Sequence, residues 1–412
     1  MATRSRPPLV LRDKNMAAIW LGQILSQAGT RMYQIAIAWW IVARTDTPGR
    51  TLGLFMVAGT LPAILLVKPI GRLIDSRRAK SLLVVSDLGC FAVIAGVGLA
   101  FKHSLMGLPL ILASGLLVAA FAAVFDPTLN KALAEAVPAA DMEEAIAFQS
   151  STQSLASFGG AVAGALLIDR LGVAGVIWLN AASFLISAGC TALLSLTASA
   201  AKSAAAENRA ASAWDMLARL PLIKNVLIGF GLTNFFLAPI LVVLPLYVSR
   251  TLHGSAALLG RLEAGVWLGL LAGTLAAPWV RAANTLALGA VCVALMGLSL
   301  GLPGLIAHPH VMMAALFCAG AALGVNNVKF MALFQETVPA EFKGRFFALM
   351  QALLSFSYPA AFLIFGMLAD CLAPPKVCLI QGLGILALSA HFLRLSRGPA
   401  RAAGEPLAAA AS

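Results

Sequence analysis

The feature that most constrains this chain is a series of apolar runs, each long enough to cross a lipid bilayer. A helix needs about 20 apolar residues to cross a hydrocarbon core of about 30 Å. Uncharged runs such as Val173 to Leu196 satisfy this length. Only 11% of the residues are charged and 60% are hydrophobic, against about 25% charged residues in a soluble domain. We therefore expect an all-α membrane protein.

The first apolar run, residues 16–43, follows a basic tail, as the core of a signal peptide would. It is too long for a cleaved signal, so we interpret it as a retained first span. Twelve spans are predicted in total, at residues 16–43, 52–74, 82–101, 108–124, 146–168, 173–196, 226–248, 257–280, 286–306, 311–331, 346–369 and 377–393.

The basic residues are distributed unevenly over the two sides of the predicted spans. Of the 29 Lys and Arg residues, 20 fall on the side of the N-terminus and seven on the other, while Arg31 and Lys68 lie within spans. The positive-inside rule then places both termini in the cytoplasm. The net charge of +12 is explained by orientation and requires no nucleic-acid partner.

A repeated motif indicates an internal duplication. The sequence EAVPA at Glu135 to Ala139 recurs as ETVPA at Glu336 to Ala340, and downstream Gln149 pairs with Gln351 at nearly the same shift. Together with the twelve predicted spans, this pattern indicates a unit of six helices that is present twice in the chain.

The predicted organisation leaves no soluble domain, which argues against an enzyme with its site outside the bilayer. The linker between the halves is rich in Ala and Ser, and the apolar residues in its last part recur at helical spacing. This pattern predicts a short surface helix there. The expected parts are a cytoplasmic tail at 1–15, an N-terminal bundle at 16–197, the linker at 198–225, a C-terminal bundle at 226–393 and a disordered cytoplasmic tail at 394–412.

The loop between the second and third spans, GRLIDSRRAK, carries a resemblance to a known family. It resembles the loop motif G-x-L-A-D-R-x-G-R-K of the major facilitator superfamily, with Gly71, Leu73, Asp75 and Lys80 in register. The basic residues are shifted by one place, because Ser76, Arg78 and Ala79 replace the motif's Arg, Gly and Arg.

In this motif Gly71 would permit close helix approach, and Asp75 could pair with helix amides and arginines as a conformational latch. A solvated charge cluster that follows the positive-inside rule is the alternative. The predicted gating residues are Gly71, Asp75, Arg77, Arg78, Lys80 and, at the inner end of the fourth span, Asp126.

Further segments resemble the branch that contains macrolide efflux pumps and the enterobactin exporter. These are TLGLFMVAGTLPAILLVKPIGRLID in the second span, the loop from Ala134 into the fifth span, and TVPAEFKGRFFALMQ before the eleventh. The resemblance implies the major facilitator fold, with two pseudo-symmetric six-helix bundles around a cavity and a solute site near the bilayer midplane. It does not imply proton coupling, because Gly159 to Gly164 lack the antiporters' proline and the fourth span lacks their arginine.

The first span carries a polar face around a permanent charge. Gln23, Gln27, Arg31 and Gln34 recur at i, i+4, i+8 and i+11, which forms one stripe on a helix. A charge at the centre of a bilayer costs at least about 2.5 to 3.5 kcal/mol, so this face must turn toward protein or a watery cavity.

Three interpretations of Arg31 remain open. It could pair with Glu263, interpreted as the only strong acidic candidate within a span, or it could bind a carboxylate, phosphate or catecholate of a solute. Snorkelling to an interface is the third, which the central position disfavours. Glu263 is also the candidate proton carrier, because separating a buried carboxyl group from an arginine changes its affinity for protons.

Other polar side chains occur in spans five, seven and eleven, where polar contact between helices is the alternative to solute binding. Six cysteines without a CxxC pair, and His308 and His310 without a third ligand, predict neither a disulfide framework nor a metal site. The predicted substrate-binding residues are Gln23, Gln27, Arg31, Gln34, Gln149, Gln153, Asn234 and Tyr358, with Arg31 and Glu263 as the coupling pair.

The combined prediction is a secondary transporter and not an enzyme. We expect a monomeric exporter, an antiporter by analogy, that moves an amphipathic, anionic solute such as a siderophore or drug by alternating access. The expected partners are the solute, protons and membrane lipids, with no cofactor. A lysophospholipid flippase and an importer of an anionic nutrient or siderophore remain alternatives.

Overall fold

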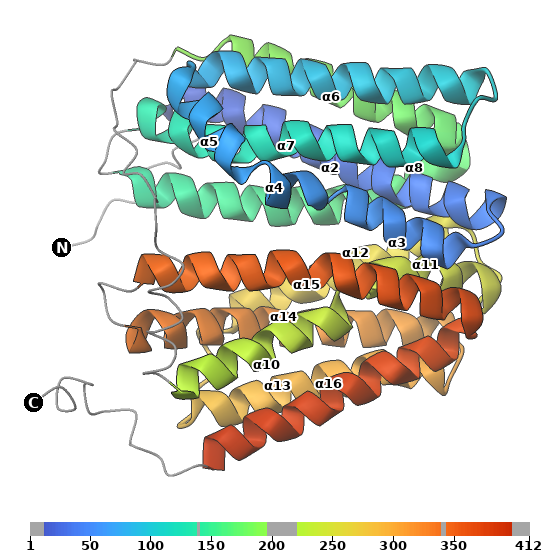
Figure 1. Ribbon diagram of the computed structural model, residues 1–412, viewed down its shortest axis with the longest axis vertical. Helices are drawn as coiled ribbons and strands as arrows, with labels where there is room; N and C mark the ends of the chain where they lie inside the picture. The colour runs from blue at the N-terminus through green and yellow to red at the C-terminus, as the bar shows by residue number, and fades with distance from the viewer. Residues whose placement is uncertain (1–11, 138–140, 196–220, 339–342, 398–412) are drawn as a thin grey trace, which may run out of the picture. The chain divides into compact units, whose positions relative to one another are not determined.

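The computed structural model describes residues 12–137, 141–195, 221–338 and 343–397 and is helical throughout these ranges apart from short connections (Figure 1). The predicted linker helix and most of the C-terminal tail lie outside the described residues. Helix α16, Pro374–Arg397, extends four residues beyond the predicted last span. Helices are the expected outcome in a bilayer because each satisfies its own backbone hydrogen bonds.

Every predicted span coincides with a helix or a set of consecutive helices. The first half contains α2 (Lys14–Arg44), α3 (Pro48–Ala58), α4 (Leu61–Leu65), α5 (Val67–Ser76), α6 (Ala79–Lys102), α7 (Leu108–Ala136) and α8 (Met142–Ala192). The second half contains α10 (Pro221–Leu237), α11 (Ile240–Arg250), α12 (Ala256–Ala276), α13 (Thr285–Gly301), η2 (Leu302–Gly304), α14 (Pro309–Thr337), α15 (Lys343–Cys371) and α16.

Ten stretches of the described helices are long and apolar enough to cross a membrane. Helix α2 is not among them although it has 31 residues, because its glutamines and Arg31 make it less apolar. One of the ten, Ser151–Ala192, contains most of two predicted spans, since α8 consists of two helices that meet at Gly172. Gly172 has a φ of 65°, a conformation that suits glycine.

Two predicted spans are interrupted. The second span is divided into α3, α4 and α5, and the seventh into α10 and α11. Pro62 and Pro69 lie in the first of these spans, and Pro239 lies at the break before α11. Proline supplies no backbone N–H group and therefore interrupts a helical hydrogen-bond ladder.

The chain divides into two compact units. The first comprises the described residues within Met1–Ala206, Ala238–Trp267 and Tyr358–Val377, and the second those within Glu207–Leu237, Leu268–Ser357 and Cys378–Ser412. Parts of α12 and α15, together with α11, therefore pack with the first-half helices. The division into two six-helix bundles stays a prediction.

In the first unit, α2 packs along α8, α6 packs against α7 and α8, and α3 to α5 contact α7. Figure 1 shows α6, α7 and α8 running alongside one another. Helix α11 contacts α2 and α3. In the second unit, α13 packs against α14. Phe330, Phe334, Phe346 and Phe392 form an aromatic core there, with ring centroids 4.9 to 6.2 Å apart between neighbours.

Candidate functional site

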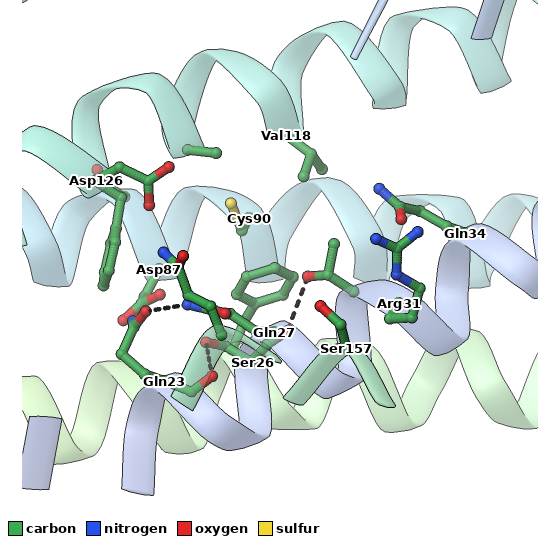
Figure 2. A pocket seen from close by; sticks show the side chains of 16 residues that line it. Gln23, Ser26, Gln27, Arg31, Gln34, Asp87, Cys90, Val118, Asp126 and Ser157 are labelled. Carbon is green, nitrogen blue, oxygen red and sulfur yellow. Dashed lines mark hydrogen bonds between the residues drawn. The ribbon is translucent and has the colours of Figure 1, made fainter. Parts of the chain in front are cut away.

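Helices α2, α6, α7 and α8 of the first unit enclose a cavity of about 280 Å³. Its wall combines charged, amide and hydroxyl side chains with apolar ones. The side chains that α2 contributes are Gln23, Ser26, Gln27, Thr30, Arg31 and Gln34. Figure 2 shows this polar face together with side chains from the other helices. The predicted stripe on the first span therefore faces a cavity inside the protein.

The amides and hydroxyls of α2 are ordered by contacts along the helix itself. Gln27 Nε2 donates to Gln23 Oε1 at 2.6 Å, and Thr30 Oγ1 donates to the Ser26 carbonyl at 2.8 Å. Both are spaced four residues apart, the distance at which side chains meet on one helix face. The local sequence thus positions this part of the wall.

Arg31 lies at one end of the cavity, beside Gln34 (Figure 2), and is half-buried. Its guanidinium carbon is 4.8 Å from the ring centroid of Trp267 on α12. Stacking on an aromatic face orients the planar guanidinium and partly compensates for its removal from water. Among the described residues it has no hydrogen-bond partner, so its donors remain available.

Close helix packing places Arg31 at this point. A Cβ atom added at Gly160 on α8 would lie 2.6 Å from the Ala28 carbonyl oxygen and 2.9 Å from the Arg31 Cβ. Only glycine therefore allows α8 to approach α2 this closely. Gly160 belongs to the glycine-rich stretch in the fifth span, which keeps its packing role without the family's proline.

Glu263 on α12 is the charged residue that interacts with Arg31 electrostatically. It is 6% exposed, and its Oε2 atom has no hydrogen-bond partner among the residues that the structure describes. No direct ion pair joins the two side chains in the part of the chain that the structure describes, where the recorded pair is Arg12 with Asp141 at 3.9 Å. The pairing of Arg31 with Glu263 stays a prediction.

Asp87 on α6 is a cavity residue that our sequence analysis missed. It is 3% exposed, and its Oδ2 atom accepts a hydrogen bond from Ser187 Oγ at 2.8 Å. Interpreting Glu263 as the only strong acid within a span was therefore wrong. The signal was available, because Asp87 interrupts the apolar run 82–101.

Asp126 on α7 also lines the cavity, at the end away from Arg31 (Figure 2). Asp126 is also one of the predicted gating residues, at the inner end of the fourth span. Its place in the cavity wall makes contact with a solute available to it as well, and its gating role stays a prediction. Asp87 and Asp126 come from neighbouring helices, which explains why their sequence spacing gave no indication of a common site.

The remaining predicted binding residues are not all brought together. Gln153 and, one turn further, Ser157 line the cavity from α8, whereas Gln149 does not. Asn234 belongs to α10 in the second unit, where its side chain donates to the Phe230 carbonyl at 2.9 Å. Tyr358 on α15 is outside the cavity wall and stacks with Phe362 at a centroid distance of 6.2 Å.

The gating motif uses its lysine to cap a helix end. Lys80 Nζ donates to the Leu194 carbonyl at 2.8 Å, just past the end of α8. Lys131 of α7 donates to the carbonyls of Ile74 and Arg77 at 2.7 and 3.1 Å. Cations are favourable at the C-terminal ends of helices because carbonyl groups there lack helical partners. These contacts attach the loop between α5 and α6 to α7 and to the end of α8, within the first unit.

The motif also predicted a close helix approach at Gly71 and a latch role for Asp75. A Cβ added at Gly71 would meet no atom within 4 Å, so the close helix approach expected there is not present in this conformation. Arg78 is the N-cap residue of α6 and is exposed, as is Arg77. The side chain of Asp75 lies outside the described side chains, and its latch role stays a prediction.

Within the described residues, no group of three or more His, Cys, Asp or Glu side chains could hold a metal ion. His308 caps the start of α14, where its Nδ1 accepts from the His310 backbone N–H at 3.3 Å. The six cysteines are free thiols. The cavity itself offers a guanidinium, carboxyl groups, amide groups and aromatic surface to a solute.

Comparisons with known proteins agree with this architecture. The chain is 24% identical to the uncharacterized MFS-type transporter YfiS of Bacillus subtilis (strain 168), with 95% of this chain and 96% of that protein covered. It is also 24% identical to macrolide efflux protein A of Streptococcus pyogenes, over 90% of this chain and 93% of that protein.

Solved structures show the same fold. A bacterial homologue of the iron transporter ferroportin, in an inward-facing state, has a TM-score of 0.73 at 15% identity and covers 94% of this chain and 99% of its own. The nucleoside transporter NupG has a TM-score of 0.68 at 11% identity, with coverage of 93% and 99%.

The family pattern described as Major Facilitator Superfamily matches residues 19–362, which is most of the chain. The matched range includes the polar face of α2, both aspartates of the cavity and the Arg31, Trp267 and Glu263 group. The chain is a multi-pass membrane transporter, not an enzyme, and it belongs to the Major Facilitator Superfamily.

Proposed function

We propose that this chain exports an amphipathic organic solute with an acidic group from a bacterial cytoplasm by alternating access. Its 24% identity to a macrolide efflux protein supports export. The distribution of basic residues supports an inner-membrane protein with both termini in the cytoplasm. Siderophores and acidic drugs are solutes of the proposed kind.

The observation that carries the proposal is the state of Arg31. Its guanidinium borders the cavity, stacks on Trp267 and lacks a hydrogen-bond partner among the described residues. A guanidinium offers five donors in a planar fork, which suits a carboxylate, phosphate or catecholate held by two parallel hydrogen bonds. An acidic solute group would thus satisfy donors that the protein leaves open.

The rest of the wall suits the other parts of an amphipathic molecule. Gln27 and Gln153 supply amide groups, while Val118, Phe125 and Phe184 supply apolar surface. Pockets for organic ligands commonly combine apolar walls with a few directed polar groups. The mixture favours an organic solute over a bare ion.

Glu263 is the proposed site of proton coupling. Its buried Oε2 atom has no hydrogen-bond partner within the described ranges, and its charge is attracted by Arg31. A conformational change that moves Glu263 away from Arg31 would remove this attraction and raise the affinity of the carboxyl group for a proton. Proton binding would then depend on which conformation the transporter adopts.

The test is an export assay in a bacterial strain that lacks its own efflux systems. Cells that express the chain are loaded with erythromycin, with a catecholate siderophore or with a lysophospholipid, and loss of each compound from the cells is measured. Export of the siderophore by the wild type, but not by Arg31→Gln, is the expected result. Arg44→Gln, an exposed change at the end of the same helix, is the matched control.

The same assay separates the alternatives. Movement of the lysophospholipid between bilayer leaflets, with no loss of siderophore, would indicate the flippase. Accumulation of siderophore inside the cells would indicate import. Unchanged export by a folded Arg31→Gln protein would exclude the binding role of Arg31.

A further inference from the structure

The cavity wall carries charges of both signs, which the proposed acidic solute alone does not explain. Arg31 is at one end, and the carboxyl groups of Asp87 and Asp126 enter from α6 and α7. Figure 2 shows Asp126 and Arg31 at opposite ends of the view, with Gln27 between them. The wall therefore has one positive and one acidic end.

The distance between the two ends follows from contacts along α2. A Cβ added at Gly22 would lie 3.1 Å from Ser187 Oγ, and this hydroxyl donates to Asp87. Asp87 is thus level with Gly22 on α2. Arg31 lies about 2.5 turns further along the helix, or ~13 Å at a rise of about 1.5 Å per residue. A molecule that reaches both groups must be elongated.

Asp87 is oriented by a buried hydroxyl group. Ser187 Oγ donates a hydrogen bond to its side chain, and only 3% of the residue is exposed. The hydroxyl carries no charge that could balance a carboxylate. Asp126, by contrast, is exposed to the cavity and has no recorded hydrogen bond to another described residue. Buried carboxylates normally have a cationic partner.

We propose that the acidic end of the cavity binds an organic ammonium group, so that the transported solute is dipolar. This inference rests on the proposed function, in which Arg31 holds the acidic group. The ammonium group binds between Asp87 and Asp126, and the amides of Gln23 and Gln27 line the middle of the molecule. Each end of the solute then meets a group of opposite charge.

Three probes of equal chain length test this charge pattern. 12-Aminododecanoic acid carries both groups, dodecylamine only the ammonium, and dodecanoic acid only the carboxylate. The purified full-length chain is placed in lipid nanodiscs, and binding is measured by isothermal titration calorimetry. Titrations into empty nanodiscs are subtracted, because all three probes also enter lipid.

The wild type is expected to bind the amino acid roughly 10- to 100-fold more tightly than dodecanoic acid, since one charge-assisted hydrogen-bonding group is added. Asp87→Asn and Asp126→Asn are each expected to reduce this margin about ten-fold or more. Dodecanoic acid should bind these variants as well as the wild type, or better. Asp169→Asn removes an exposed carboxyl group outside the cavity and is the matched control.

The outcomes for the two proposals are distinct. If the wild type does not bind the amino acid, or binds it no more tightly than dodecanoic acid, the dipolar solute is excluded. It is also excluded if both aspartate variants keep the full margin, which would indicate that these carboxyl groups carry protons instead. In either case a loss of dodecanoic acid binding in Arg31→Gln would leave the proposed function intact.

Discussion

The carboxylate of Asp370 caps the start of α3 by accepting hydrogen bonds from the backbone N–H groups of Gly49 and Arg50, at 2.8 and 2.7 Å. Asp370 lies near the end of α15, 321 residues from Gly49. The positive end of the α3 dipole adds to these two bonds. The contact ties a helix of the predicted second bundle to one of the first, within one compact unit.

Replacing Asp370 by Ala is expected to lower the free energy of unfolding by about 1 to 3 kcal/mol, because two backbone donors lose their acceptor. If the cap also closes the outer end, as the predicted orientation implies, the variant should label more readily at an introduced Thr47→Cys. Thermal unfolding and thiol labelling of the purified protein measure the two effects. The control is Asp46→Asn, an exposed carboxyl group next to the same helix. Identical unfolding and labelling in D370A and wild type would remove Asp370 from gating.

Gly160 is expected to tolerate no side chain. Gly160→Ala places a Cβ 2.6 Å from the Ala28 carbonyl oxygen, so α2 must move from α8 and displace Arg31. Overpacking of this kind typically costs about 1 to 3 kcal/mol of stability. Gly159→Ala is a matched control, since its Cβ would meet no atom within 4 Å. Equal melting temperatures for the two variants would contradict the close packing described here.

Trp267 is expected to contribute to solute affinity by orienting Arg31. Trp267→Leu keeps an apolar side chain but removes the aromatic face beneath the guanidinium, a contact worth about 0.5 to 2 kcal/mol. The affinity of this variant for dodecanoic acid in nanodiscs should fall by about 2- to 30-fold. Exposed Trp279→Leu serves as the control. A Trp267→Leu protein with wild-type affinity would show that the stacking does not position Arg31.

Glu263→Gln is expected to uncouple solute transport from the proton gradient. The amide keeps the shape of the side chain but cannot exchange a proton, so an imposed pH difference should no longer drive solute flux in proteoliposomes. Glu336→Gln, an exposed change in the second unit, should respond to the pH difference as the wild type does. Persistence of pH-driven flux in E263Q would exclude Glu263 as the proton carrier.

The sequence by itself determined the membrane class, the span positions and the polar face of α2. These are local properties, because span length follows from bilayer thickness and a helical face follows from 3.6 residues per turn. The family could be recognised for a similar reason, since the Gly71 to Lys80 motif is contiguous. None of these features depends on how helices that are distant in the chain pack against one another.

Only the tertiary structure decided which polar residues share a cavity. It joined Asp87 and Asp126 to the α2 face, left Gln149 outside, and placed Trp267 under Arg31. It also paired Asp370 with the first turn of α3. Each of these relationships joins helices that are far apart in the chain. The rotation and spacing of such helices depend on side-chain packing across the whole unit, which the spacing of residues along one helix does not encode.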